Sequence, residues 1–108
     1  MKCFDVMKKD LVTVGPDDRV VEAARQMARA DVGFVPVVAD GKPVGVITDR
    51  DIVVRVVAEG NDPLMLVKDA MSEDVFCAFA DDDLDKAARL MADKRVSRVL
   101  VTDEKGAL

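Results

Sequence analysis

The sequence predicts a small α/β (α+β) protein made of two tandem β-α-β-β-α units, and three observations support this. A shift of 64 residues aligns positions 7–44 with 71–108 without a gap, and 12 of the 38 aligned residues are identical. Within each unit, short β-rich runs alternate with a stretch whose apolar residues recur at helical spacing. The 108 residues, half of them apolar, are enough for one compact domain but not for two independent enzyme domains.

The first half of unit one reads as a strand, a turn and a helix. Residues 11–14 are Leu-Val-Thr-Val, a β-rich run followed by the turn signal Gly-Pro. Asp17 and Asp18 stand where carboxylates usually cap the unpaired N–H groups of a helix. Apolar residues at 20, 24, 27 and 28 predict a helix that begins at 20 and ends near 30.

The second half of unit one reads as a hairpin and a second helix. Residues 34–38 form a buried strand, Asp40 and Gly41 form a hairpin turn, and 44–48 form the returning strand. A helix is predicted over 49–59, with Gly60 as its stop.

The repeat sets the predicted boundaries: unit one at 1–60, a linker at 61–70 and unit two at 71–108. Unit two repeats the strand (75–78), the helix (84–94) and the strand (98–102). It stops at Leu108, the position that matches Val44, so its last strand and helix are missing. We expect the natural chain to continue, because the strand at 98–102 would otherwise lack a neighbour.

The composition excludes several classes of function. The net charge of −5 and the absence of Trp and Tyr argue against nucleic acid as the main partner. With no His, the chain has no Ser/His or Cys/His pair and no His-bound metal. Its two cysteines, Cys3 and Cys77, form no metal-binding or disulfide pattern. No apolar stretch approaches the roughly 20 residues of a membrane span. We expect a cytoplasmic protein with no catalytic residues and no metal.

Four stretches carry a resemblance to a known family: Asp5-Val6-Met7, an acidic pair before an Ala-Ala-Arg-x-Met helix, Val-Pro-Val-Val at 35–38, and Gly-Val-Ile-Thr-Asp-Arg-Asp at 45–51. They resemble the cystathionine-β-synthase (CBS) domain, which occurs as pairs called Bateman modules and as stand-alone bacterial pair proteins. The resemblance implies two CBS motifs related by a pseudo-two-fold axis. It also implies that clefts between the motifs bind AMP, ADP, ATP, S-adenosylmethionine or NAD, and that modules form homodimers.

The ligand signature of the family matches Thr48 and Asp51 at a predicted strand-to-helix junction. A carboxylate in the first helical turn suits the two hydroxyls of a ribose. The free N–H groups of that turn would attract an anion, and the Thr48 hydroxyl would donate to phosphate. A Thr-x-x-Asp at a helix start is also an ordinary capping motif, and this alternative stays open.

The resemblance implies that the other side of the cleft comes from unit two. There Val75, Phe76 and Val96 would sandwich an adenine, and Arg98 would bind phosphate through two parallel hydrogen bonds. The mirror-image cleft lacks a Thr-x-x-Asp, so at most one complete site is expected. The full set of predicted ligand-binding residues is Val46, Thr48, Asp51, Val75, Phe76, Val96, Ser97 and Arg98.

Two functions remain in competition. The favoured one is a non-catalytic regulatory module that binds an adenosine-containing ligand and needs no resident cofactor. The alternative is a dimerisation or interaction module that keeps the fold and binds no nucleotide. Asp49 and Asp51 place two negative charges close together at the predicted site. They would disfavour a highly charged ligand such as ATP, and for such ligands they favour the alternative function.

Overall fold

The computed structural model describes residues 12–73, 77–79, 89 and 100–102. Along the chain, the elements of unit one are α2 (Val20–Ala30), β1 (Phe34–Ala39), β2 (Lys42–Thr48), the short helix α3 (Asp49–Asp51) and the π-helix η1 (Ile52–Val57). The 3-10 helix η2 (Val67–Asp69) and the strands β3 (Cys77–Phe79) and β4 (Leu100–Thr102) follow. Helices and strands therefore mix as predicted, and the α+β class is confirmed.

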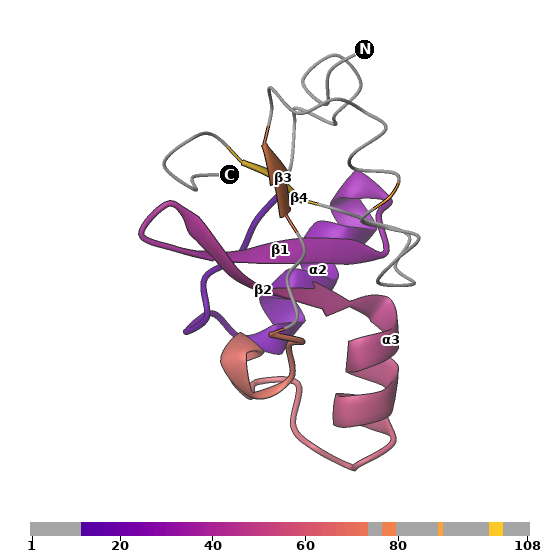
Figure 1. Cartoon of the computed structure of the whole chain (residues 1–108). Helices are drawn as coiled ribbons and strands as arrows, with labels where there is room; N and C mark the ends of the chain where they lie inside the picture. Colours follow the sequence, from indigo (N-terminus) through magenta and orange to yellow (C-terminus); the bar gives the residue numbers. More distant parts are fainter. Residues whose placement is uncertain (1–11, 74–76, 80–88, 90–99, 103–108) are drawn as a thin grey trace.

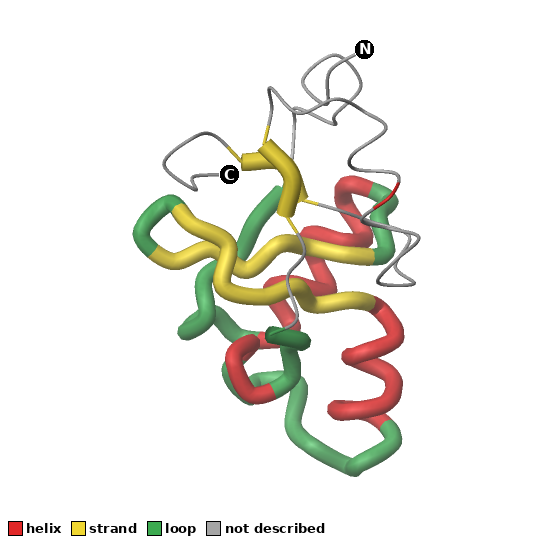
Figure 2. Tube along the Cα trace, in the orientation of Figure 1, coloured by secondary structure: helices red, strands yellow, loops and turns green. Residues whose placement is uncertain are grey.

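The β1–β2 hairpin forms the sheet of unit one. The strands pair antiparallel from Phe34↔Thr48 to Ala39↔Lys42, with a bulge between Val37 and Val38. At the turn both Asp40 (φ 53°) and Gly41 (φ 79°) are left-handed, the conformation of the tight hairpin turn that the Asp-Gly pair predicts. Helix α2 packs against β1, and α3 continues directly from the end of β2 (Figures 1 and 2).

The core of the described part is almost entirely aliphatic. Val35, Val37 and Ile47 of the hairpin are fully buried, and α2 contributes Val20, Ala23 and Met27. Burying a side chain of this kind stabilises the fold by about 1.5–3 kcal/mol. The other four members of this core cluster come from outside the hairpin and α2: Val14, Val56, Val67 and Ala70.

The strand predicted at 11–14 is reduced to one bridge among the described residues. Val14 pairs in parallel with Val37, donating to Pro36 O (3.1 Å) and accepting from Val38 N (2.8 Å). The chain then turns at once, since Asp18 N donates to Gly15 O at 3.2 Å. The turn leaves no length for further pairing on that side.

The prediction that Asp17 and Asp18 cap α2 is wrong. Arg19 occupies the N-cap position and makes no side-chain cap. Asp18 Oδ2 instead accepts from Gly15 N at 2.7 Å, and Asp17 pairs with Lys68 at 3.2 Å. Main-chain carbonyls take over the capping: Val20 N donates to Met65 O and Val21 N to Pro63 O, both at 2.9 Å.

Residues 61–70, predicted as a linker, pack closely onto unit one. Val67 and Ala70 are fully buried. Val67 N donates to Asp18 O at 2.8 Å, and Arg19 Nη1 donates to Leu64 O at 2.9 Å. This stretch is therefore part of the core and of the helix cap as well as a connection between the units.

The helix predicted at 49–59 lies where expected but is not a regular α-helix. After one α-helical turn it continues as a π-helix that ends at Val57, and Gly60 follows with a left-handed φ of 69°. In unit two, β4 lies within the predicted strand 98–102, and β3 overlaps the predicted strand 75–78 at two residues and ends one residue beyond it. The two strands pair in parallel, Cys77↔Leu100 to Phe79↔Thr102. The helix predicted at 84–94 lies outside the described residues, apart from Arg89, which is helical.

Candidate ligand site at the end of β2

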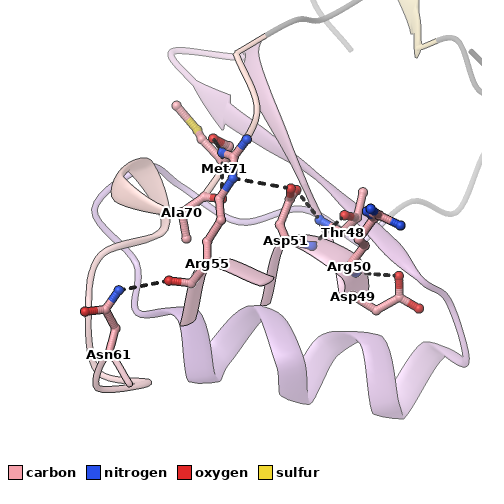
Figure 3. A network of polar contacts seen from close by, with 8 residues as sticks. All are labelled: Thr48, Asp49, Arg50, Asp51, Arg55, Asn61, Ala70 and Met71. Atoms are coloured by element: carbon pink, nitrogen blue, oxygen red, sulfur yellow. Dashed lines mark hydrogen bonds and ion pairs between the residues drawn. The ribbon is translucent and has the colours of Figure 1, made fainter. Parts of the chain in front are cut away.

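Thr48 and Asp51 form a reciprocal capping box where β2 becomes α3. Thr48 has an extended backbone (φ −114°, ψ 163°), and its Oγ1 accepts from Asp51 N at 3.0 Å. Asp51 Oδ2 accepts in return from Thr48 N at 2.9 Å (Figure 3). The capping interpretation of the motif is thus confirmed, and such a cap contributes about 1 kcal/mol.

The capping box leaves binding capacity on both side chains. A carboxylate has about four lone-pair sites, and Asp51 uses one of them on Thr48 N. The Thr48 hydroxyl accepts in the cap, so its proton is still free to be donated. The Asp51 side chain is 15% exposed, so the carboxylate is mostly buried but still in contact with solvent.

The expected anion site at the first helical turn is not supported. Asp49 N donates to Gly33 O at 2.9 Å, Arg50 N to Asp49 Oδ1 at 2.8 Å and Asp51 N to Thr48 Oγ1 at 3.0 Å. Each of these three N–H groups therefore has a partner within the protein. A phosphate at this point would have to displace one of them.

Val46, the other predicted site residue in the described part, lies on β2 with its main chain already paired. Val46 N donates to Ser72 O and Ser72 N to Val46 O, both at 2.9 Å. The segment that begins unit two is thereby bonded to β2 two residues before Thr48. The Val46 side chain is half-buried, and its main-chain N–H and C=O bond β2 to Ser72.

Arg55 joins this site, although the sequence reasoning missed it. Its Nη1 donates to Met71 O at 2.7 Å and to Ala70 O at 3.3 Å, and its Nε lies 3.9 Å from Asp51 Oδ1 (Figure 3). The contact with Asp51 could have been predicted from the spacing of four residues, because side chains at i and i+4 are neighbours on a helix. The contacts with residues 70 and 71 have no local sequence signal.

The five other predicted residues, Val75, Phe76, Val96, Ser97 and Arg98, lie outside the described residues, so their roles stay predictions. Within the described ranges, no three His, Cys, Asp or Glu residues gather in a way that could hold a metal ion. None of the helices described there is long and apolar enough to cross a membrane.

The sequence is similar to several curated proteins. The protein MK0525 of Methanopyrus kandleri is 34% identical over 106 residues, which cover 96% of this chain and 54% of that protein. YhcV of Bacillus subtilis, a CBS domain-containing protein, is 35% identical over 100 residues, covering 93% of this chain and 71% of YhcV. Inosine-5'-monophosphate dehydrogenase of Methanocaldococcus jannaschii is 39% identical, but the chain spans only 21% of that enzyme.

Solved structures have the same fold. The CBS domain pair of the protein MJ0100, in complex with 5'-methylthioadenosine and S-adenosyl-L-methionine, superimposes with a TM-score of 0.86 at 26% identity, over 100% of this chain and 85% of that one. CBSX2 in complex with AMP gives a TM-score of 0.82 at 25% identity, over 99% of this chain and 85% of that one. The model of the CBS domain matches residues 3–58 and 67–108. Both halves of the repeat are covered, and the chain belongs to the CBS domain family.

Proposed function

We propose that this chain is a non-catalytic regulatory module that binds an adenosine-containing ligand, with Asp51 holding the ribose. The observation that carries the proposal is the capping box, which presents an oriented carboxylate and a hydroxyl proton at the end of β2. Relatives support the ligand class, since the CBS pair of MJ0100 binds S-adenosyl-L-methionine and CBSX2 binds AMP.

The N–H groups of the first helical turn determine which part of a ligand can bind at this site. Because these groups already bond within the protein, Asp51 and Thr48 are suited to the uncharged nucleoside part of a ligand. Any phosphate would then depend on another cation, and Arg98 is our candidate. We therefore expect affinity to reside in the adenosine moiety and to grow with a phosphate only through Arg98.

Asp51→Asn tests the ribose role by calorimetric titration with adenosine. Asn keeps an oxygen for the bond from Thr48 N but replaces the second acceptor with a donor, so the cap survives and the ribose contact does not. Loss of hydrogen bonds to a charged group should weaken adenosine by about 1.5–3 kcal/mol. Asp49→Asn removes the same charge two residues away and is the matched control. Equal losses in both variants would attribute the effect to net charge and contradict the assignment.

Arg98→Ala tests the phosphate role in a two-by-two comparison of wild type and variant, each titrated with adenosine and with AMP. AMP should lose far more affinity than adenosine, because only AMP carries the phosphate. Equal losses would mean that Arg98 acts through structure. No binding of either ligand to wild type would favour the alternative function, a dimerisation module.

That alternative, and the homodimer expected in either case, draw support from the surface of η1. Val53, Val54 and Val57 are 57%, 46% and 67% exposed, an unusual exposure for three apolar side chains on one short helix. Met27 of α2, at 8% exposure, is a core residue beneath the helix surface. We propose that modules pair through their helices, with this valine surface of η1 at the contact.

A further inference from the structure

Arg55 connects two features that the proposed function treats separately. On one side is the Asp51 carboxylate, 3.9 Å from Arg55 Nε. On the other are the carbonyls of Ala70 and Met71, at 3.3 and 2.7 Å from Arg55 Nη1. One guanidinium therefore contacts both the candidate ribose site and residues 70 and 71, where unit one passes into unit two (Figure 3).

The segment held by Arg55 fits tightly against β2. A Cβ built on Gly45 would lie 2.6 Å from Met71 Sδ and 2.8 Å from Ser72 O. The Met71 side chain and the Ser72 main chain therefore both pack directly against the backbone of β2. Ser72 forms two main-chain bonds with Val46. A shift of residues 70–72 would break these bonds and move the partners of Arg55 at the same time.

The two contacts of Arg55 differ in strength. At 3.9 Å, with a side chain 49% exposed, the ion pair with Asp51 contributes little by itself. The bonds to the two carbonyls are charge-assisted, and one of them is short. The carbonyls therefore fix the guanidinium, and with it the position of the positive charge beside Oδ1 of Asp51, the oxygen that does not serve the cap.

We propose that Arg55 is a positioning residue that couples ligand binding at Asp51 to the junction between the two units, a proposal that rests on the binding role of Asp51. A ligand that holds Asp51 strengthens the β2–Ser72 pairing through Arg55. By thermodynamic reciprocity, a firmly paired junction strengthens binding of the ligand. The junction is thus the part of the fold through which occupancy of the site reaches unit two.

Hydrogen exchange of single amides, measured by NMR on the full chain, tests the coupling. The Val46 and Ser72 amides report on the junction, and the Val14 and Val38 amides, bonded within unit one, are the internal reference. In Arg55→Met without ligand, the two junction amides should exchange about fivefold faster or more, the lower end of typical coupling, and the reference amides should not change. Adenosine should slow the junction amides in wild type and much less in the variant.

Titration with adenosine supplies the second measurement, because an uncharged ligand is little affected by the loss of a distant charge. Arg55→Met should weaken binding about fivefold or more. Arg25→Met is the control, an arginine on α2 with a 61% exposed side chain, and should bind as wild type does. In an Asp51→Asn background Arg55→Met should cost almost nothing further, because Arg55 acts through Asp51.

The outcomes separate this proposal from the proposed function. If wild type binds adenosine but its junction amides do not respond, the coupling is wrong and the binding role stands. If wild type does not bind adenosine, the proposed function fails, and the unliganded exchange rates alone decide whether Arg55 holds the junction. If exchange of the reference and junction amides is accelerated equally in Arg55→Met, Arg55 only stabilises the fold as a whole. That result would overturn the proposal.

Discussion

Gly45→Ala should destabilise the protein by forcing residues 71 and 72 away from β2. Gly45 is buried, and the new Cβ would meet Met71 Sδ at 2.6 Å and Ser72 O at 2.8 Å, both shorter than real contacts of a Cβ. The methionine side chain can swing aside. The Ser72 carbonyl cannot do so cheaply, because it accepts from Val46 N at 2.9 Å. Overpacking of this kind costs about 1–3 kcal/mol.

Urea and thermal unfolding of the full chain measure this effect. For a domain of this size, each kcal/mol lowers Tm by about 4–8 °C. Gly15→Ala is the matched control, because its Cβ would find only ordinary contacts, the nearest at 3.6 Å from Asp18 Oδ2. Loss of glycine entropy in the unfolded chain should leave that variant equal to wild type or slightly more stable. A Gly45→Ala protein as stable as Gly15→Ala would refute the tight junction on which the role of Arg55 also depends.

Three further predictions concern the cap, the core and the assembly. Thr48→Val removes the acceptor for Asp51 N and should cost about 1 kcal/mol in urea unfolding; an unchanged midpoint would contradict the capping role. Val67→Ala, at a fully buried position, should cost about 1.5–3 kcal/mol, whereas Leu64→Ala, at a 58% exposed position, should stay within about 0.5 kcal/mol. Sedimentation should give twice the 11.7 kDa chain mass, and a constant monomer mass across micromolar concentrations would exclude the homodimer.

The elements that the sequence predicted well depend on local signals. Helix α2 has the predicted bounds because its apolar spacing matches the helical repeat. The hairpin turn falls at Asp40 and Gly41 because these residue types tolerate a left-handed backbone. The Thr48–Asp51 capping box likewise lies within four residues, so the motif alone identified it.

Two of the errors share one physical cause, which is competition from main-chain groups far along the sequence. Asp17 and Asp18 have the right chemistry to cap α2, but Pro63 and Met65 bring carbonyls to its first N–H groups. Arg55 is an ordinary surface arginine by sequence, and its partners are carbonyls 15 and 16 residues away. Every residue has a main-chain carbonyl, so the sequence pattern carries no signal for either contact.

The short stretch 45–48 of β2 explains why the candidate site lies where the units meet. Each of its residues serves a different neighbour: position 45 gives room to Met71, Val46 pairs with Ser72, Ile47 fills the core and Thr48 caps α3. No residue of the stretch can shift without disturbing another of these contacts. The Asp51 carboxylate accepts from Thr48 N, so the same set of contacts holds it in place. A ligand bound there would therefore act on a rigid strand that already contacts the start of unit two, and Arg55 gives it a second connection to the same segment.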